Sequence, residues 1–196
     1  MIAFRINKNS ELYEVLSACM KIVKSAKNSV YYIPKMNNIH YNPATNEIVA
    51  TDGKRLLCYE ADLIKHHINQ KVQTSNLTLV GDIVIVEEAK DGYVDYRGLM
   101  KRLSFEKTLV VGFVDSYSKP SNEATIQMAY HDIKLPNKAM DIFDSISDLF
   151  DRVDIPTEHN QPVRFRSIDY TVQFIISPCS CPNWKIEQGE EKTKEN

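Results

Sequence analysis

Apolar and polar positions follow two different periods at the start of the chain. Residues 2–6 alternate as in a short strand, and apolar side chains then recur at helical spacing from about residue 10 to residue 28. Asn9 or Ser10 can cap this helix, because their side-chain oxygens accept hydrogen bonds from the free backbone N–H groups of the first turn. The apolar stripe is formed by Leu12, Leu16, Cys19, Val23 and Ala26. The pattern therefore predicts a strand followed by an amphipathic helix.

Short β-prone runs follow the predicted helix. They occupy residues 30–33, 38–41, 48–51 and 54–60. The first run stops at a proline, and Asp52-Gly53 separates the last two runs as a two-residue hairpin turn, because both residues accept positive φ angles. Residues 1–62 are therefore expected to form a strand, a helix and an antiparallel meander.

The middle of the chain is less regular. We expect single strands at 77–87, 108–115 and 124–133, because these stretches are rich in β-branched and apolar residues. A short helix is expected at 96–103, and a polar loop at 116–122. These elements separate the first unit from a second one.

A second amphipathic helix is predicted from about Lys138 to Val153. Its buried stripe consists of Phe143, Ile146, Phe150 and Val153. Its exposed face carries Asp141, Asp144, Asp148 and Asp151. Two strands, 163–166 and 171–177, follow and are joined by a turn at 168–170. The end of the chain thus repeats the order strand, helix and antiparallel strands.

Two such units can place both helices on one face of a continuous curved antiparallel sheet, which is an α+β arrangement. We expect one domain over residues 1–182. Its units are about 1–62 and 124–178, with intervening strands at 77–118. Residues 183–196 are predicted to be a disordered polar tail.

Composition narrows the classes of protein that fit. The chain has 196 residues, 43% hydrophobic and 26% charged, so it can bury a core and does not have the composition of a disordered chain. No apolar run approaches the roughly 20 residues that span a bilayer, and the N-terminus lacks a signal-peptide pattern, so we expect a cytoplasmic protein without membrane contact. The net charge is −2. Any contact with nucleic acid must therefore come from a local basic face.

Motifs for catalysis and cofactor binding are not found in the sequence. It has no glycine-rich phosphate loop and no G-x-S-x-G elbow, so we expect neither an enzyme nor a bound cofactor. His66-His67 and the pair Cys179 and Cys181 are of residue types that can bind a metal ion. The simpler interpretations are a solvated loop and two free thiols, because no second ligand pair lies at the usual spacing.

Charged residues on the two predicted helices have two interpretations each. The aspartates of the second helix can form a cation site or simply a solvated face. Lys21 and Lys24 of the first helix are likewise either a solvated face or contacts to phosphate groups. Independent evidence for nucleic acid favours the second interpretation of the lysines.

Such evidence comes from the hairpin at the end of the first meander. Its sequence, Val49-Ala50-Thr51-Asp52-Gly53-Lys54-Arg55-Leu56, resembles the hallmark A-T-D-G-H-R-L of the bacterial DNA sliding clamp, the β subunit of DNA polymerase III. Lys54 stands where that family has histidine. The resemblance includes Val30-Tyr31-Tyr32 upstream, and Phe174-Ile175-Ile176-Ser177-Pro178 looks like the apolar run before proline at the clamp C-terminus. It covers 1–62 and extends to 124–178.

The resemblance implies a fold and a function. A clamp domain consists of two β-α-β-β-β units, with two helices facing the DNA channel, and clamps encircle duplex DNA and tether polymerases and repair proteins without catalysing a reaction. Carried over, a pocket for a short apolar motif of these partners would be lined by Thr51, Gly53, Lys54, Arg55, Leu56, Ile175, Ser177 and Pro178. The alternative for Arg55 is an ion pair in an ordinary β-hairpin. Lys21 and Lys24 would face DNA.

The chain departs from the family in length and charge. A clamp ring has six such domains, whereas this chain has room for one, so a ring requires several copies of it. Four aspartates on the second helix would oppose DNA phosphates, and residues 63–123 contain extra material. Two functions therefore stay open: an oligomeric clamp-like protein of DNA replication or repair, and a clamp-derived adaptor or decoy that binds a protein partner and no DNA.

Overall fold

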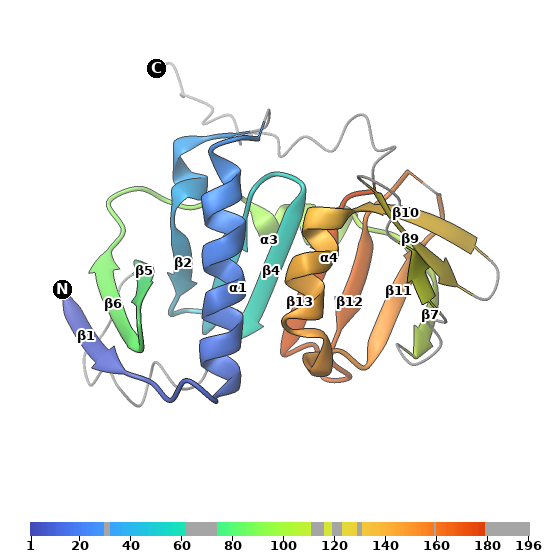
Figure 1. The fold of residues 1–196 in the computed structure, drawn as a ribbon. Coiled ribbons are helices and arrows are strands. Elements are labelled where there is room, and N and C mark those ends of the chain that lie inside the picture. The colour runs from blue at the N-terminus through green and yellow to red at the C-terminus, as the bar shows by residue number, and fades with distance from the viewer. Residues whose placement is uncertain are drawn as a thin grey trace, which may run out of the picture.

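A ten-stranded antiparallel sheet forms the body of the molecule (Figure 1). The computed structural model describes residues 1–29, 32–61, 74–110, 116–118, 123–128, 131–158 and 160–178. The first part of the sheet has the order β1 (Ile2–Arg5), β6 (Ile83–Glu88), β5 (Ser75–Val80), β2 (Ile39–Asn42), β3 (Glu47–Thr51) and β4 (Arg55–Glu60). The order continues with β13 (Val172–Ile176), β12 (Val163–Arg166), β11 (Arg152–Pro156) and β7 (Phe105–Val110).

Two helices, α1 (Glu11–Ala26) and α4 (Asn137–Asp144), lie side by side on one face of this sheet (Figure 1). We call this the helix face and the opposite one the outer face. The Ser10 hydroxyl caps α1 by accepting a hydrogen bond from the Tyr13 N–H at 3.3 Å. The main core fills the space between helices and sheet, with Leu12, Ile22, Met140, Phe165 and Phe174 among its buried side chains. The α+β prediction, with two helices on one face of an antiparallel sheet, is confirmed.

Residues 77–87 differ from the prediction, because they form two strands and not one. β5 and β6 pair as a hairpin whose turn includes Gly81 at a φ of 63°. This hairpin lies between β1 and β2, so the first strand of the chain does not neighbour the meander directly. Part of the extra material after residue 62 thus extends the sheet of the first unit.

A hairpin also replaces the single strand expected at 124–133. β9 (Glu123–Met128) pairs with β10 (His131–Pro136), and β8 (Ser116–Ser118) pairs with β9 on its other side. The loop prediction for 116–122 is therefore wrong at 116–118. These strands form a separate three-stranded sheet, from which β10 leads into α4.

The second helix is shorter than predicted. α4 ends at Asp144, because Ser145 and Ile146 donate their backbone N–H groups to carbonyls three residues back and the Ser145 hydroxyl bonds the Ile142 carbonyl at 2.7 Å. A 3₁₀ turn, η3 (Ser147–Leu149), follows. The predicted apolar stripe is nevertheless buried, and the Phe143 ring stacks on Phe150 with 5.6 Å between centroids.

Shorter elements lie between the long ones. The strand predicted at 30–33 is partly outside the described residues, and Tyr32 and Ile33 lead into the 3₁₀ helix η1 (Pro34–Asn37) without forming a strand. The short helix expected at 96–103 is confirmed as α3 (Tyr96–Arg102), which lies on the outer face of the sheet (Figure 1). In the part of the chain that the structure describes, no helix is long and apolar enough to cross a membrane.

Candidate functional site

The turn between β3 and β4 is fixed by its own side chains. The Thr51 hydroxyl donates to the Arg55 carbonyl at 2.7 Å and accepts from the Gly53 N–H at 3.2 Å. Asp52 Oδ1 accepts from the N–H groups of Lys54 at 3.0 Å and Arg55 at 2.8 Å. Gly53 has a φ of 84°, a region that residues with a Cβ rarely adopt. The hallmark residue types therefore specify this turn locally.

A buried ion pair ties the turn to α1. Arg55 Nε donates to Asp52 Oδ2 at 2.9 Å, and Arg55 Nη2 contacts the same oxygen and the Ser25 hydroxyl. Ser25, near the end of α1, also donates to Asp52 Oδ2 at 2.9 Å. Arg55 is 7% exposed and Asp52 is 4% exposed. Arg55 thus forms the ion pair of the alternative interpretation, and this pair is buried.

Strand pairing brings the two predicted halves of the pocket together. β4 and β13 are antiparallel neighbours in which Leu56 is opposite Ile175. Beyond the strand end, the Ser177 N–H donates to the Lys54 carbonyl at 2.8 Å. We call the predicted pocket residues on these segments the junction: Thr51, Gly53, Lys54, Arg55, Leu56, Ile175, Ser177 and Pro178. Lys54 is exposed, and the other junction residues are buried.

An apolar segment on the outer face explains part of this burial. Val49, Leu56, Cys58 and Ile175 belong to a second apolar cluster, separate from the main core. The cluster also contains Ala26 and Met36, and the segment 93–103 contributes Val94, Tyr96 and Leu99, with Tyr93, Met100 and Leu103 half-buried against it. Sequence reasoning expected a helix here and missed that it covers the junction. We call this segment the α3 cover.

Glu47 fastens the α3 cover at its polar end. Its Oε2 accepts from the Tyr96 hydroxyl at 2.6 Å and from Arg97 Nη2 at 2.8 Å. Burial alone would raise the pKa of the Glu47 carboxyl, but these hydrogen bonds outweigh it and hold that pKa below its usual value. Burial and the bond to Glu47 raise the pKa of Tyr96 to about 12. Both groups therefore keep the protonation states that the bond needs at neutral pH.

The helix face carries opposite charges at its two ends. Lys21 and Lys24 are exposed on the C-terminal half of α1, the end at which the β3–β4 turn with Lys54 is anchored through Ser25. Exposed acidic residues lie at Glu11, Glu14, Asp141, Asp144 and Asp148. The predicted row of four helical aspartates is wrong, since Asp148 lies in η3 and Asp151 follows it, accepting from the Ile168 N–H at 3.2 Å.

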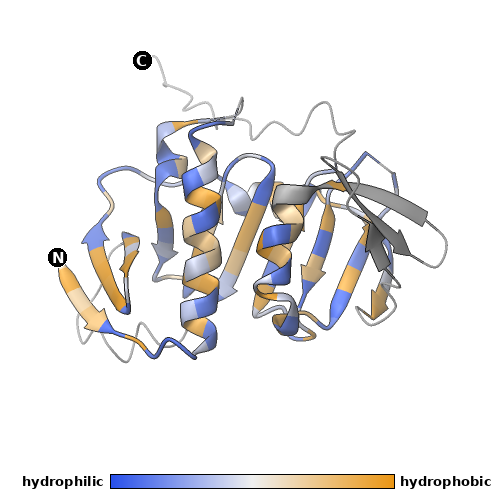
Figure 2. Ribbon diagram, in the orientation of Figure 1, coloured by the Kyte–Doolittle hydropathy of each residue, from blue (hydrophilic) through white to orange (hydrophobic). Residues whose placement is uncertain are grey.

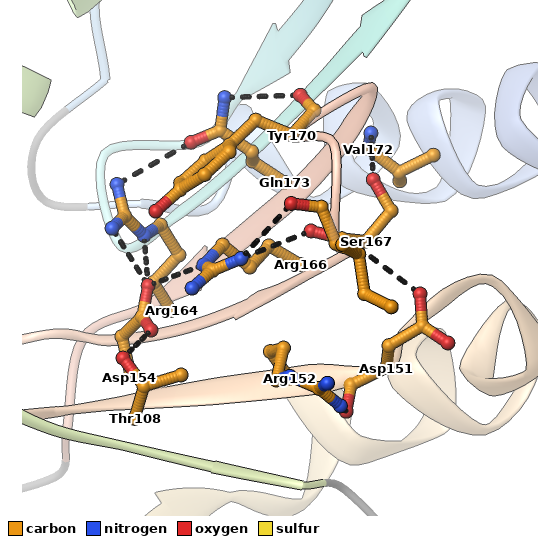
Figure 3. A network of polar contacts seen from close by, with 11 residues as sticks. Thr108, Asp151, Arg152, Asp154, Arg164, Arg166, Ser167, Tyr170, Val172 and Gln173 are labelled. Atoms are coloured by element: carbon orange, nitrogen blue, oxygen red, sulfur yellow. Dashed lines mark hydrogen bonds and ion pairs between the residues drawn. The ribbon is translucent and has the colours of Figure 1, made fainter.

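The other half of the outer face holds an ion network that the sequence did not reveal (Figure 3). Asp154 on β11 is 1% exposed, and its Oδ2 accepts from Arg164 Nε at 2.6 Å and Arg166 Nε at 2.9 Å, while Thr108 donates to Oδ1 at 2.7 Å. Burial raises the pKa of Asp154, but the bonds from Arg166, Thr108 and Arg164 outweigh it and lower that pKa below its usual value. The Arg166 guanidinium also lies over the Tyr170 ring, 4.0 Å from its centroid.

Metal binding finds no support in the residues that the structure describes, where no cluster of His, Cys, Asp and Glu side chains is placed to hold an ion. The candidates His66, His67, Cys179 and Cys181 lie outside those residues. Cys19 and Cys58 are buried free thiols, and burial raises the pKa of both.

A polar cavity of about 330 Å³ lies beside the α3 cover. Its lining residues are Pro34, Lys35, Asn38, Asn76, Glu87, Glu88, Lys90, Asp91, Gly92 and Tyr93. The Tyr93 ring also stacks on His40 of β2, with 4.4 Å between centroids. The mixed charges of this lining indicate no particular ligand.

Comparison with known proteins gives matches among solved structures alone, since no model of a protein family and no curated protein matches the chain. The similar structures are bacterial sliding clamps. The DNA polymerase III β subunit of Thermotoga maritima is 13% identical with a TM-score of 0.46, and it is matched over 91% of this chain and 65% of its own. The sliding clamp of Bacillus subtilis is 14% identical with a TM-score of 0.49, over 90% of this chain and 63% of its own.

The β chain of Streptococcus pneumoniae is 14% identical with a TM-score of 0.47, and the match again covers 91% of this chain. The matches cover 63% to 65% of these clamp chains, so the chain spans slightly less than two thirds of their length. At such identities the likeness concerns the fold.

Proposed function

We propose that the chain is a non-catalytic, sliding-clamp-like protein of DNA replication or repair that binds short apolar motifs of polymerase-type partners at the junction. The pairing of β4 with β13 supports this most directly. It joins the hallmark turn to the 175–178 segment, although the two are more than a hundred positions apart in the sequence. Two segments with a clamp-like sequence thus meet at one end of the β4–β13 pair.

Each junction residue has a role in this proposal that follows from its position. Lys54 is exposed and offers a cation to a carboxylate of the partner. Arg55 is a positioning residue, because its pair with Asp52 holds the turn. Leu56 and Ile175 supply the apolar surface beneath. We therefore expect a partner segment that is short, apolar and weakly acidic.

A ring requires copies of the chain to associate, and the sheet has two edges for it. In the described part of the sheet, β1 and β7 are the outermost strands and each pairs on one side. Such edges are templates for pairing with another chain. Copies joined from β1 to β7 would continue the sheet head to tail, with α1 and its Lys21 and Lys24 toward an enclosed duplex.

Partner binding is tested with labelled peptides that carry Leu and Phe side chains beside one carboxylate. Lys54→Glu reverses the exposed charge and is expected to weaken the affinity about fivefold, the size of one partly screened charge contact. Lys8→Glu is the matched control, since this exposed lysine precedes α1 at its opposite end. Equal affinities for wild type and Lys54→Glu, or no binding at all, would count against a junction that binds such motifs.

An adaptor that binds no DNA is the second candidate function. The exposed aspartates Asp141 and Asp144 favour it, because they lie on α4 beside α1 on the face that a duplex would meet. Retention of the protein on circular but not on linearised duplex, together with an oligomeric mass, supports the clamp. Lys21→Glu with Lys24→Glu should then weaken duplex binding and reduce its salt dependence. A monomer that ignores duplex at low salt leaves the adaptor.

A further inference from the structure

The outer face of the junction is occupied by the chain itself. Along β4, side chains alternate between the two faces, so Leu57 and Tyr59 join the main core while Leu56 and Cys58 point to the outer face. Leu56 is 0% exposed. A partner motif that used this apolar surface would therefore have to take the place of whatever now covers it.

The α3 cover makes the contacts that such a motif would make. Tyr96 and Leu99 are buried in the second apolar cluster, and Met100 places its Sδ 3.9 Å from Cys58 Sγ. These three residues follow the i, i+3, i+4 spacing of a helix face that docks into a groove. In addition to these apolar contacts, Tyr96 and Arg97 each donate a hydrogen bond to the Glu47 carboxylate.

The construction of the α3 cover suits reversible displacement. α3 has seven residues, too few to be stable as a helix without its contacts. The segment 89–95 before it has no helix or strand. Arg97 is 51% exposed in its side chain, so its ion pair with Glu47 is screened by solvent and adds little to the hold on α3.

We propose that the α3 cover is an intramolecular occupant of the partner-binding surface, and that a partner segment binds by displacing it. The segment it fits is the short apolar motif proposed above, with an aromatic side chain in the place of Tyr96 and two aliphatic side chains three and four positions further on. This inference rests on the proposed function, because it assigns the state of the junction before a partner arrives. The apparent affinity is then lowered by the fraction of molecules in which the cover is closed.

Two variants shift the cover in opposite directions. Arg97→Ala removes the ion pair to Glu47 and leaves the apolar contacts in place, so it favours the open cover. Lys101→Ala is its matched control, because Lys101 is an exposed lysine one helical turn after Arg97 on α3. Met100→Cys places a second thiol facing Cys58, and its oxidation to a disulfide closes the cover covalently, with the two electrons and two protons taken up by added diamide.

The probe is a labelled peptide with the sequence of residues 93–103, added to the full chain and measured by fluorescence anisotropy. Arg97→Ala is expected to bind it about threefold more tightly than wild type or Lys101→Ala. Oxidised Met100→Cys should bind it at least tenfold more weakly than the same protein after reduction. The peptides with Leu and Phe side chains beside one carboxylate should bind the variants with the same order of affinities and should compete with the probe.

The outcomes separate this inference from the proposed function. Leu/Phe peptides that bind wild type, Arg97→Ala and the oxidised variant equally would leave the proposed function standing and overturn the displaceable cover. Binding of the 93–103 probe alone, with no Leu/Phe peptide bound by any variant, would retain the cover and reject the proposed partner class. If mass spectrometry shows no disulfide in Met100→Cys, the comparison of Arg97→Ala with Lys101→Ala decides, and equal affinities would overturn the inference.

Discussion

The two halves of the outer face differ in how their buried side chains are stabilised, one by apolar packing and the other by paired charges. Beneath the α3 cover, β3, β4 and β13 present apolar side chains that a short helix shields from water. On β11 and β12 the corresponding positions carry Asp154, Arg164 and Arg166, which satisfy one another, and none of the described helices lies above them. Figure 2 shows hydrophilic and hydrophobic positions alternating along these two strands.

The charged half has fixed interaction partners, whereas the apolar half can exchange the segment that covers it. The charges around Asp154 have fixed partners, and removing one would leave a buried charge unpaired. The apolar half is complete when any apolar segment of the right shape lies on it, so α3 and a partner can substitute for each other. We therefore expect the charged half to contribute more to stability and the covered half to contribute more to binding.

The largest expected effect concerns the charged half. Asp154→Asn removes the charge shared by Arg164 and Arg166 and is expected to lower the free energy of unfolding by about 3 kcal/mol, because both guanidinium groups then lack their carboxylate. The denaturation midpoint measures this, with an unchanged m-value as the sign of a pure stability effect. A loss below about 1 kcal/mol would remove the contrast between the two halves.

A smaller loss is expected for the covered half. Leu99→Ala removes most of a buried side chain of the α3 cover and should lower the free energy of unfolding by about 2 kcal/mol. This value is at the lower end for such substitutions, because a short surface helix can relax around the cavity. Amide hydrogen exchange should accelerate in α3 more than in β12. Uniform acceleration across the sheet would show that the cover is part of the main cooperative unit.

His40 allows the covered half to be probed by pH. Burial lowers the pKa of His40 from 6.5 to about 4, so the unfolded chain takes up this proton before the folded one does. The stability that depends on His40 being neutral is complete above pH 6.5 and is lost as the pH falls from 6.5 toward 4. His40→Phe keeps a ring against Tyr93 and should flatten this part of the pH profile. An unaltered slope would assign it to other groups.

The first unit was predictable because its signals are local. The cap at Ser10, the stripe of α1 and the Asp52-Gly53 turn each depend on residues a few positions apart. The β5–β6 hairpin also has a local signal, Gly81-Asp82 within the β-prone run. The early end of α4 had none, since Phe143 and Phe150 remain buried after the backbone leaves the helix.

The sequence named two segments that meet in the fold, but it did not indicate their environment. Sequence resemblance named both segments of the junction, and strand pairing brings Leu56 opposite Ile175. The burial of Arg55 and the position of the α3 cover depend on tertiary packing, because the same sequence pattern fits a helix on either face of the sheet. The Asp154 network depends likewise on the register between β11 and β12, which pairs Asp154 with Arg164.

Backbone amide NMR signals of the ¹⁵N-labelled chain, followed while an apolar Leu/Phe peptide is added, test the central claim most directly. Binding at the junction predicts that the signals of Lys54, Ile175 and Ser177 shift together with those of α3, while the signals around Asp154 stay in place. Shifts confined to other parts of the sheet, or a spectrum that does not change at saturating peptide, would contradict it.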